Sequence, residues 1–219
     1  MDNGVILIDK PSGMTSFGVV ARIRRQLSKQ QSKKIKVGHT GTLDPFATGL
    51  LILVIGSECK KADQYSKLDK VYEATIRLGQ VSSTGDPEGA LTDFSDYVPS
   101  LPEIETVVKN FLGEISQIPP IFSAIKIDGQ RAYKMARAGK EVKMPTRQVK
   151  IYNLDILEYS YPELKIRVNV SSGTYIRTLA KDIGKDLNTG AYCSELRRLS
   201  IGDWSIVDAK SLKSFGIVD

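Results

Sequence analysis

Histidine and cysteine are scarce in this chain of 219 residues, which has one histidine, His39, and two cysteines, Cys59 and Cys193. Zinc and iron sites draw most of their ligands from these residue types, so the composition argues against a metal site. Two cysteines also give neither a disulfide framework nor a metal-binding spacing. We therefore expect reduced thiols and no metal, as is usual for a cytoplasmic protein.

Long hydrophobic runs are also missing. The apolar stretch at residues 5–8 is shorter than the core of a signal peptide, and no run approaches the length that spans a membrane. The Gly-Lys-Ser/Thr signature of phosphate-binding loops is absent, which leaves a nucleotide-dependent enzyme as a weak alternative. The hydrophobic content of 41% still suffices for a packed core. We expect a single cytoplasmic domain over residues 1–219, without membrane contact.

Acidic residues are missing from residues 10–43, which carry eight basic ones. A second basic segment, residues 126–150, has eight basic residues against two acids. Between them, residues 82–116 reverse the sign with seven acids and one lysine. Basic segments separated by an acidic one suggest an oriented face for a polyanion such as a nucleic acid. Ordinary solvated surfaces use the same residue types, so charge alone leaves both interpretations open.

The spacing of apolar residues predicts both strands and helices. Six aliphatic residues in a row, 50–55, predict a strand buried on both faces, and the alternation at residues 70–78 predicts a strand with one buried face. Three of the expected helices have these apolar sides: Phe17, Val20, Ile23 and Leu27 after a cap at Thr15 or Ser16; Ile104, Val107, Val108 and Phe111 after a capping box of Ser100 and Glu103; and Ile176, Leu179, Ile183 and Leu187. Shorter helices are expected over residues 57–67 and near residues 132–138. Strands outnumber helices, which indicates an α+β fold with a large, mixed, mostly antiparallel central sheet and flanking helices.

Residues 121–147 are the least regular part of the sequence. They follow the pair Pro119 and Pro120, are basic, contain two glycines and show little periodic apolar content. A segment of this kind is typical of a mobile surface arm, and its charge suits contact with RNA. We therefore predict a mobile RNA-binding arm over about residues 121–147.

The most informative segment is the polar loop that precedes the apolar run at residues 50–55. It contains several glycines and a single carboxylate, Asp44, whose neighbours Leu43 and Pro45 hydrate a charge poorly. A carboxylate in such a setting either takes up a proton or finds a cationic partner. A turn without chemical function explains the same residues, because aspartate, proline and glycine are common in turns. The spacing alone does not decide between these two interpretations.

Five motifs resemble those of the TruB family of tRNA pseudouridine synthases. They are GHTGTLDPFATGLL at residues 38–51, DKPSGMTS at 9–16, DKVY at 69–72, GTYIR at 173–177 and LRRL at 196–199. The motifs follow the order of the family and span nearly the whole chain. The resemblance implies the pseudouridine synthase fold, no cofactor and no metal. It also implies that the chain isomerises a tRNA uridine, the one at position 55 in the T loop, to pseudouridine.

The resemblance also implies roles for eight residues. Asp44 matches the catalytic aspartate that attacks the uridine, Tyr72 a tyrosine against the target base, and Arg177 an arginine that keeps the aspartate ionised. The substrate-binding matches are His39, which fills the space of the flipped nucleotide, Lys60 on the RNA backbone, Asp86 near the substrate, and Tyr175 and Leu196 lining the base pocket. Taken singly, each residue has an ordinary structural explanation, such as a core tyrosine or an exposed lysine.

The family usually carries a further small C-terminal RNA-binding (PUA) domain, and the chain stops at Asp219, too early to hold it. We therefore expect a monomer that recognises the T-arm stem-loop of tRNA without that domain. The competing hypothesis is a non-catalytic RNA-binding or tRNA-folding module, because residues 38–41 fit the G-x-x-G clamp of KH domains. A KH clamp lies between two helices, whereas this sequence precedes an apolar strand.

Overall fold

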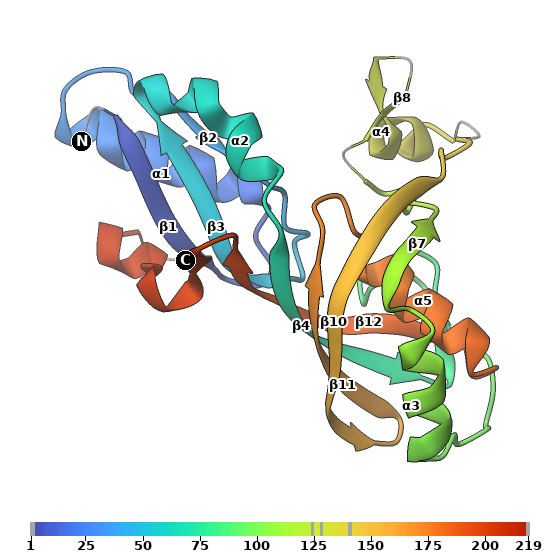
Figure 1. The fold of residues 1–219 in the computed structure, drawn as a ribbon. Helices are drawn as coiled ribbons and strands as arrows, with labels where there is room; N and C mark the ends of the chain where they lie inside the picture. Colours follow the sequence, from blue (N-terminus) through green and yellow to red (C-terminus); the bar gives the residue numbers. More distant parts are fainter. Residues whose placement is uncertain (1–2, 124, 128, 140–141, 218–219) are drawn as a thin grey trace. The chain divides into compact units, whose positions relative to one another are not determined.

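The computed structural model describes residues 3–123, 125–127, 129–139 and 142–217. The chain forms two compact units (Figure 1). The first unit comprises Met1–Tyr72 and Leu196–Asp219, and the second unit comprises Glu73–Glu195. Two strands, β4 (Lys70–Leu78) and β12 (Ala191–Ile201), begin in one unit and end in the other.

The central strand of the first unit is β3 (Thr48–Ile55). Strands β1 (Gly4–Lys10) and β2 (Val37–His39) pair with it in antiparallel orientation, and β12 pairs in parallel with its first residues. The aliphatic residues 50–55 are all fully buried; Leu51, Leu53 and Ile55 belong to one hydrophobic cluster, and Leu50 and Ile52 belong to another. Because successive side chains of a strand point to opposite faces, the predicted strand with two buried faces is confirmed.

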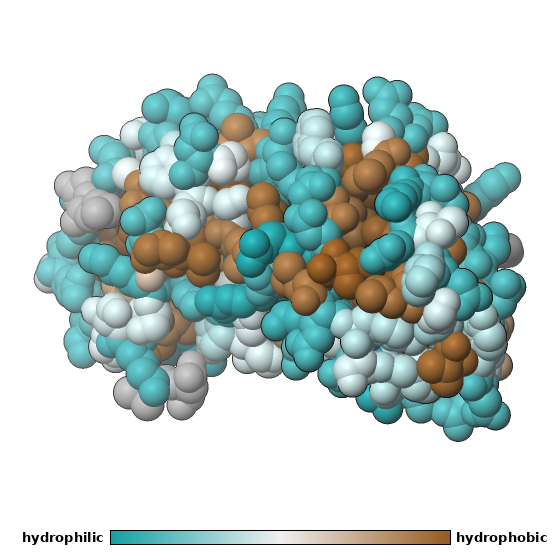
Figure 2. All heavy atoms as spheres, turned by 60° about the horizontal axis from the view of Figure 1, so that its bottom comes forward, coloured by the Kyte–Doolittle hydropathy of each residue, from teal (hydrophilic) through white to brown (hydrophobic). Residues whose placement is uncertain are grey.

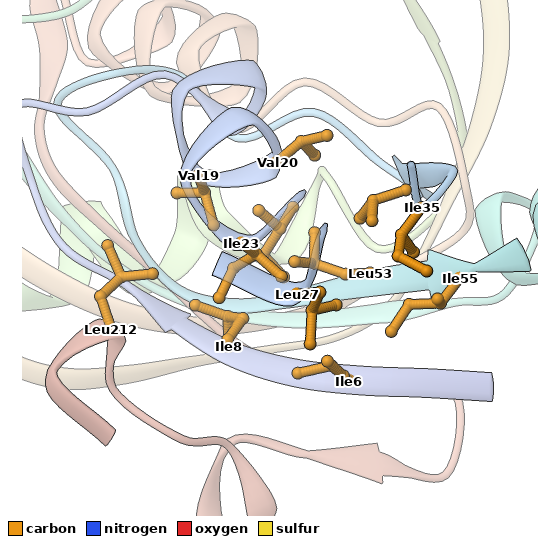
Figure 3. Packing of buried hydrophobic residues seen from close by; sticks show 12 residues of the cluster. Ile6, Ile8, Val19, Val20, Ile23, Leu27, Ile35, Leu53, Ile55 and Leu212 are labelled. Atoms are coloured by element: carbon orange, nitrogen blue, oxygen red, sulfur yellow. The ribbon is translucent and has the colours of Figure 1, made fainter. Parts of the chain in front are cut away.

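Helix α1 (Ser16–Gln30) packs on one face of these strands (Figure 3). The hydroxyl of Thr15 accepts a hydrogen bond of 2.9 Å from the backbone N–H of Gly18, which confirms the predicted cap. The prediction for Phe17 was wrong, because this side chain is 64% exposed. Ser16 takes the buried position instead, since its hydroxyl lies within hydrogen-bonding distance of both backbone groups of Leu43, 2.8 Å from N and 3.0 Å from O.

The other face of β3 is covered by short elements of the first unit. The expected helix over residues 57–67 is divided into η1 (Gly56–Lys61) and α2 (Ala62–Ser66). The chain ends with β13 (Trp204–Ser205), which pairs antiparallel with β12, followed by η2 (Ile206–Asp208) and η3 (Leu212–Phe215). The side chains that cover Leu50 and Ile52 on this face are Val5, Leu7, Tyr65, Leu68, Ile201, Ile206 and Ala209.

In the second unit the strands follow the order β12, β4, β11 (Glu163–Val170), β10 (Arg147–Ser160) and β7 (Gly113–Gln117). Strand β10 pairs antiparallel with both β11 and β7. Ala74, Ile76 and Leu78 of β4 are buried, as the alternation in the sequence predicts. The pair of β3 and β12 is parallel, whereas β1 with β3, β10 with β11 and β10 with β7 are antiparallel, so the whole sheet is mixed and mostly antiparallel, which confirms the predicted fold class.

The helices of the second unit are α3 (Leu101–Lys109), α4 (Ala132–Arg137) and α5 (Ile176–Asp186). The capping box is confirmed, because the backbone N–H of Ser100 donates a 2.7 Å hydrogen bond to the Glu103 carboxylate. Two small strand pairs complete the unit: β5 (Gln80–Ser82) with β6 (Leu91–Asp93), and β8 (Lys126–Ile127) with β9 (Gln130–Arg131). Positions 124, 128, 140 and 141 of the predicted arm lie outside the described residues, and its mobility stays a prediction.

Candidate active site

The loop that carries Asp44 connects β2 to β3 and is held by the segment between β1 and α1. The buried ammonium of Lys10 donates to the carbonyl of Pro45 at 3.1 Å and to those of Pro11 and Met14 at 2.8 and 2.6 Å. Further hydrogen bonds join the same two segments: Gly13 N to Pro45 O at 2.9 Å, Ser12 Oγ to Phe46 O at 2.9 Å, and the two between Ser16 and Leu43. The motifs at residues 9–16 and 38–51 therefore form one structure around the partly buried Asp44.

A second buried cation, Arg198 of β12, holds the two ends of the same loop. Its Nε donates to the carbonyl of Leu50 at 2.7 Å, and its Nη2 donates to the carbonyl of Gly41 at 3.1 Å. The side chain is 1% exposed. Gly49 lies opposite Arg198 in the parallel pair, with φ at +103°, and a Cβ atom there would lie 2.3 Å from the Arg198 carbonyl oxygen. The backbone is so close at this point that only glycine fits.

The strand that carries Tyr72 begins with a third buried cation, Lys70. Its ammonium donates to the carbonyl of Ser66 at 2.7 Å and also to that of Leu68. Burial, and next the positive charge of Arg198, lower the pKa of Lys70 to about 8. Tyr72 itself is 7% exposed, as its apolar neighbours in the alternating pattern predicted.

The other predicted site residues of the first unit lie on three different elements. His39 ends β2 and is partly buried, Lys60 is exposed in η1, and Leu196 is buried in β12. Leu196 is also connected to the Asp44 loop, because its carbonyl accepts a long hydrogen bond of 3.5 Å from the hydroxyl of Thr48. The exposure of Lys60 suits a contact with RNA backbone, and it suits an ordinary surface lysine equally well.

In the second unit, Arg177 and Asp86 form a buried ion pair. Arg177 Nη1 lies 2.8 Å from Asp86 Oδ2, and both side chains are 4% exposed. The guanidinium also donates to the carbonyls of Thr84 at 3.0 Å and Phe122 at 2.8 Å. The other carboxylate oxygen of Asp86 accepts from the Thr84 hydroxyl at 2.5 Å and from the Glu88 N–H at 3.1 Å. Asp86 is therefore both the turn residue of its loop and a partner that orients Arg177.

Tyr175, the residue before α5, is connected to β7. Its backbone N–H donates to the side-chain oxygen of Gln117 at 3.0 Å, and its carbonyl accepts from the amide nitrogen of Gln117 at 3.3 Å. Because Gln117 is 1% exposed, this two-way contact fixes the start of the helix that carries Arg177. The sequence did not predict a role for Gln117, which no spacing or motif distinguishes.

The structure therefore brings together two groups of predicted site residues, one in each unit. In the first unit, the motifs at residues 9–16, 38–51 and 196–199 meet around Asp44. In the second unit, Asp86 meets Arg177. The pairing of Arg177 with Asp44, which belong to different units, stays a prediction. Lys10 and Arg198 were missed as buried residues, although both lie in motifs that the sequence singles out.

The G-x-x-G sequence at residues 38–41 lies in a different setting from the clamp of a KH domain. Gly38 and His39 belong to β2, and the chain continues through the Asp44 loop into β3, so the G-x-x-G sequence does not join two helices as in a KH domain. Among the described residues, no group of three or more histidine, cysteine, aspartate or glutamate side chains could hold a metal ion. The same part of the chain contains no helix long and apolar enough to cross a membrane.

Comparison with known proteins gives matches to both the sequence and the fold. A family model described as "TruB family pseudouridylate synthase (N terminal domain)" matches residues 25–176. The tRNA pseudouridine synthase B of Azoarcus sp. (strain BH72) is 44% identical over 212 residues, which cover 97% of this chain and 69% of the relative. The tRNA pseudouridine synthase B of Phocaeicola vulgatus is 42% identical over 214 residues, which cover 96% of this chain and 91% of the relative.

Solved structures agree with these sequence relatives. A chain in the crystal structure of a Cbf5-Nop10-Gar1 complex has a TM-score of 0.73 and 32% identity, covering 97% of this chain and 53% of its own length. A chain in the structure of an H/ACA RNP bound to a substrate RNA containing 2′-deoxyuridine has a TM-score of 0.69 and 30% identity, covering 99% of this chain and 56% of its own length. This chain thus spans about half the length of these two solved chains.

Proposed function

Since this chain belongs to the TruB family of pseudouridylate synthases, we propose that it isomerises the uridine at position 55 in the T loop of tRNA. The family is one of isomerases, and the relatives named tRNA pseudouridine synthase B support tRNA as the substrate. The fold is the pseudouridine synthase fold, with a mixed, mostly antiparallel sheet. Recognition of the T-arm stem-loop and a monomeric state are further parts of the proposal.

The reaction breaks one bond of the nucleotide and forms another. The bond between ribose C1′ and base N1 is cleaved, and C1′ is then joined to C5 of the same uracil. The hydrogen of C5 is released and N1 gains a proton, so no electrons are gained or lost overall. An ionised carboxylate at the glycosidic centre can act as the nucleophile or base that this exchange requires.

One observation carries the proposal: Asp44 lies in a loop whose backbone is fixed on both sides by buried side chains. Lys10 holds the carbonyl of Pro45, and Arg198 holds those of Gly41 and Leu50. A reacting group gains most from being held in one geometry, since a displacement of about 1 Å costs on the order of a hundredfold in rate. A loop that served only as a turn between two strands would not require two buried cations, which are costly to desolvate.

Arg177 and Tyr72 are the proposed partners of Asp44. Arg177 would keep the carboxylate ionised in a dry site, and its ion pair with Asp86 fixes the plane of the guanidinium. Tyr72 would stack on the uracil and exchange a proton with it. The buried position of the Tyr72 ring suits a pocket wall better than a surface contact.

The remaining predicted residues are proposed to handle the RNA around the target. A uridine stacked in a folded loop must be turned out of the stack before C1′ can be reached. His39, the last residue of β2 and next to Gly38, is proposed to fill the vacated space, and Lys60 to contact a phosphate. Tyr175 and Leu196 are proposed to line the pocket that takes the flipped base.

Tritium release tests the proposed function directly. Substrate tRNA transcribed with uridine carrying tritium at C5 loses the label to water only if the C5–H bond is broken. We expect release by the wild-type protein from whole tRNA and from an isolated T-arm stem-loop, and none from a stem-loop with cytidine at the target position. Asp44→Asn keeps the shape of the side chain and removes its charge, so release should fall by at least about a thousandfold while RNA binding persists.

The matched control is Asp63→Asn, which changes an exposed aspartate of α2 in the same unit. This variant should release tritium at the wild-type rate. An Asp44→Asn variant that works within about tenfold of wild type would contradict the assignment of Asp44. A wild-type protein that binds the stem-loop but releases no tritium would instead favour an RNA-binding module.

A further inference from the structure

The exposed ring of Phe17 is the starting point. Hydrophobic side chains reach the surface of this protein at several places (Figure 2), and single ones need no special explanation. Among the residues that the structure describes, Phe17, at 64%, and Phe94 of the second unit, at 61%, are the two phenylalanines that are more than half exposed. The two differ in their surroundings, because Phe94 follows β6 in the acidic segment at residues 82–116 whereas Phe17 lies in the acid-free segment at residues 10–43.

The neighbours of Phe17 on α1 are cationic. Arg22 is exposed, and its Nη1 turns back along the helix to the carbonyl of Gly18, at 3.4 Å. A Cβ atom on Gly18 would lie 3.5 Å from this Nη1, so the guanidinium lies against the glycine next to Phe17. Arg24 is also exposed and follows Phe17 by seven residues, about two helical turns, on the same side of the helix. The exposed ring of Phe17 therefore has the exposed Arg24 on its own side of α1, while the Arg22 guanidinium lies over the adjacent Gly18.

This part of α1 is joined to the candidate catalytic loop. Ser16, the residue before Phe17, places its hydroxyl 2.8 Å from the backbone nitrogen of Leu43, which precedes Asp44. The hydroxyl also lies 3.0 Å from the Leu43 carbonyl, and this contact is buried. The start of α1 and the Asp44 loop are therefore held together, so Phe17 directly follows a residue that contacts this loop.

We propose that Phe17 is a stacking site for an unpaired RNA base, one that is not the isomerised uridine, with Arg24 on the same side of the helix for a nearby phosphate. The inference rests on the proposed function, since it takes RNA as the ligand of this unit. Proteins that bind looped-out or single-stranded RNA stack bases on aromatic side chains and follow the backbone with basic ones. A base stacked on Phe17 would keep the nucleotide next to the target from returning to its place in the loop.

The charge around the ring favours RNA over a protein partner. No acidic residue occurs in residues 10–43, so every ionised side chain near Phe17 in the sequence is positive. An apolar protein contact also needs several exposed apolar side chains together, whereas the neighbours of Phe17 along the helix are Gly18, Ala21 and arginines. One aromatic ring among cations suits a base and its phosphate.

The test compares three substitutions of Phe17 in the full chain. The probes are T-arm stem-loops with 2-aminopurine at one loop position each, never at the target. We expect quenching at one position on binding to the wild type, and its loss in Phe17→Ala and Phe17→Leu. Both variants should weaken stem-loop binding by about 5- to 150-fold, the range that base–aromatic stacking covers. Phe17→Trp, which keeps an aromatic face, should bind within about threefold of wild type.

The matched control is Phe94→Ala, which removes an equally exposed ring in the acidic segment and should leave binding and quenching unchanged. Any one of three results would overturn the proposal: Phe17→Leu binds the stem-loop as tightly as wild type, Phe17→Ala keeps the wild-type affinity, or Phe94→Ala loses as much affinity as Phe17→Ala. Failure of the proposed function is separate, because it would appear as a wild-type protein that releases no tritium.

Discussion

Replacing Arg198 by methionine is the sharpest test of how the Asp44 loop is held. Methionine fills much of the same volume but donates no hydrogen bond, so the carbonyls of Leu50 and Gly41 lose the donors at 2.7 and 3.1 Å. A hydrogen bond from a charged donor contributes about 1.5–3 kcal/mol. Two such bonds contribute about 3–6 kcal/mol to the free energy of unfolding. The substitution also removes the cost of burying the charged guanidinium, which offsets a few kcal/mol of this loss.

We therefore expect Arg198→Met to lower the free energy of unfolding by about 2–4 kcal/mol. For a chain of this size, that corresponds to a fall in Tm of roughly 5–15 °C. Arg198→Lys should lower the free energy of unfolding by about half as much, because a single ammonium cannot donate in both of the directions in which the guanidinium donates. Single-turnover tritium release should fall by about tenfold to a hundredfold in Arg198→Met, since Asp44 is held less firmly.

Urea unfolding and single-turnover kinetics at saturating enzyme measure the two effects separately. The matched control is Arg197→Met, the next residue of β12, whose partly exposed guanidinium pairs with Asp9 at 2.8 Å. Loss of that exposed pair should cost less than about 1 kcal/mol. The reasoning is refuted if Arg198→Met costs no more than Arg197→Met and keeps the wild-type rate.

Two further predictions concern backbone geometry and pH. Gly49→Ala should destabilise the protein far more than Gly13→Ala: both glycines have positive φ, at +103° and +77°, but only the Cβ at Gly49 meets backbone, the Arg198 oxygen at 2.3 Å. Urea unfolding should give about 1–2 kcal/mol for Gly13→Ala and at least about 3 kcal/mol for Gly49→Ala. Hydrogen bonds, first of all the one from the Ser100 side chain, lower the pKa of Glu103 to about 2. The ionised carboxylate therefore stabilises the fold at pH values above its ordinary pKa of 4.5, and this contribution disappears as the pH falls towards 2. The stability difference between wild type and Glu103→Gln should therefore be largest above pH 4.5 and vanish near pH 2, and a difference independent of pH would contradict this.

The features that the sequence predicted correctly depend on residues close together in the chain. The hydroxyl of Thr15 bonds the N–H three residues later, and the capping box joins Ser100 to Glu103 over the same distance. The buried strand at residues 50–55 needed only six consecutive aliphatic side chains. In each case the interacting groups are within a turn of helix or a few residues of strand, so local spacing contains the necessary information.

The roles of Lys10 and Arg198 could not be predicted, because their partners are distant in the sequence. Lys10 meets the Pro45 carbonyl 35 residues away, and Arg198 meets Leu50 and Gly41 at separations of 148 and 157 residues. Lysine and arginine are normally exposed, and only a tertiary arrangement that offers several carbonyls to one cation makes burial favourable. The motifs identified these segments as important without indicating whether a basic residue there binds RNA or holds the loop.

The error at Phe17 has a similar origin and a functional consequence. Helical periodicity accommodates either Ser16 or Phe17 next to Val20 and Ile23 on the buried side, and apolar preference favours phenylalanine. The structure selects Ser16, because its hydroxyl lies against both backbone groups of Leu43, 27 residues away, and an aromatic ring could not replace that contact. Fixing Ser16 inward rotates Phe17 into solvent. The contact that holds the Asp44 loop is thus also the reason why an aromatic ring faces solvent at the start of α1.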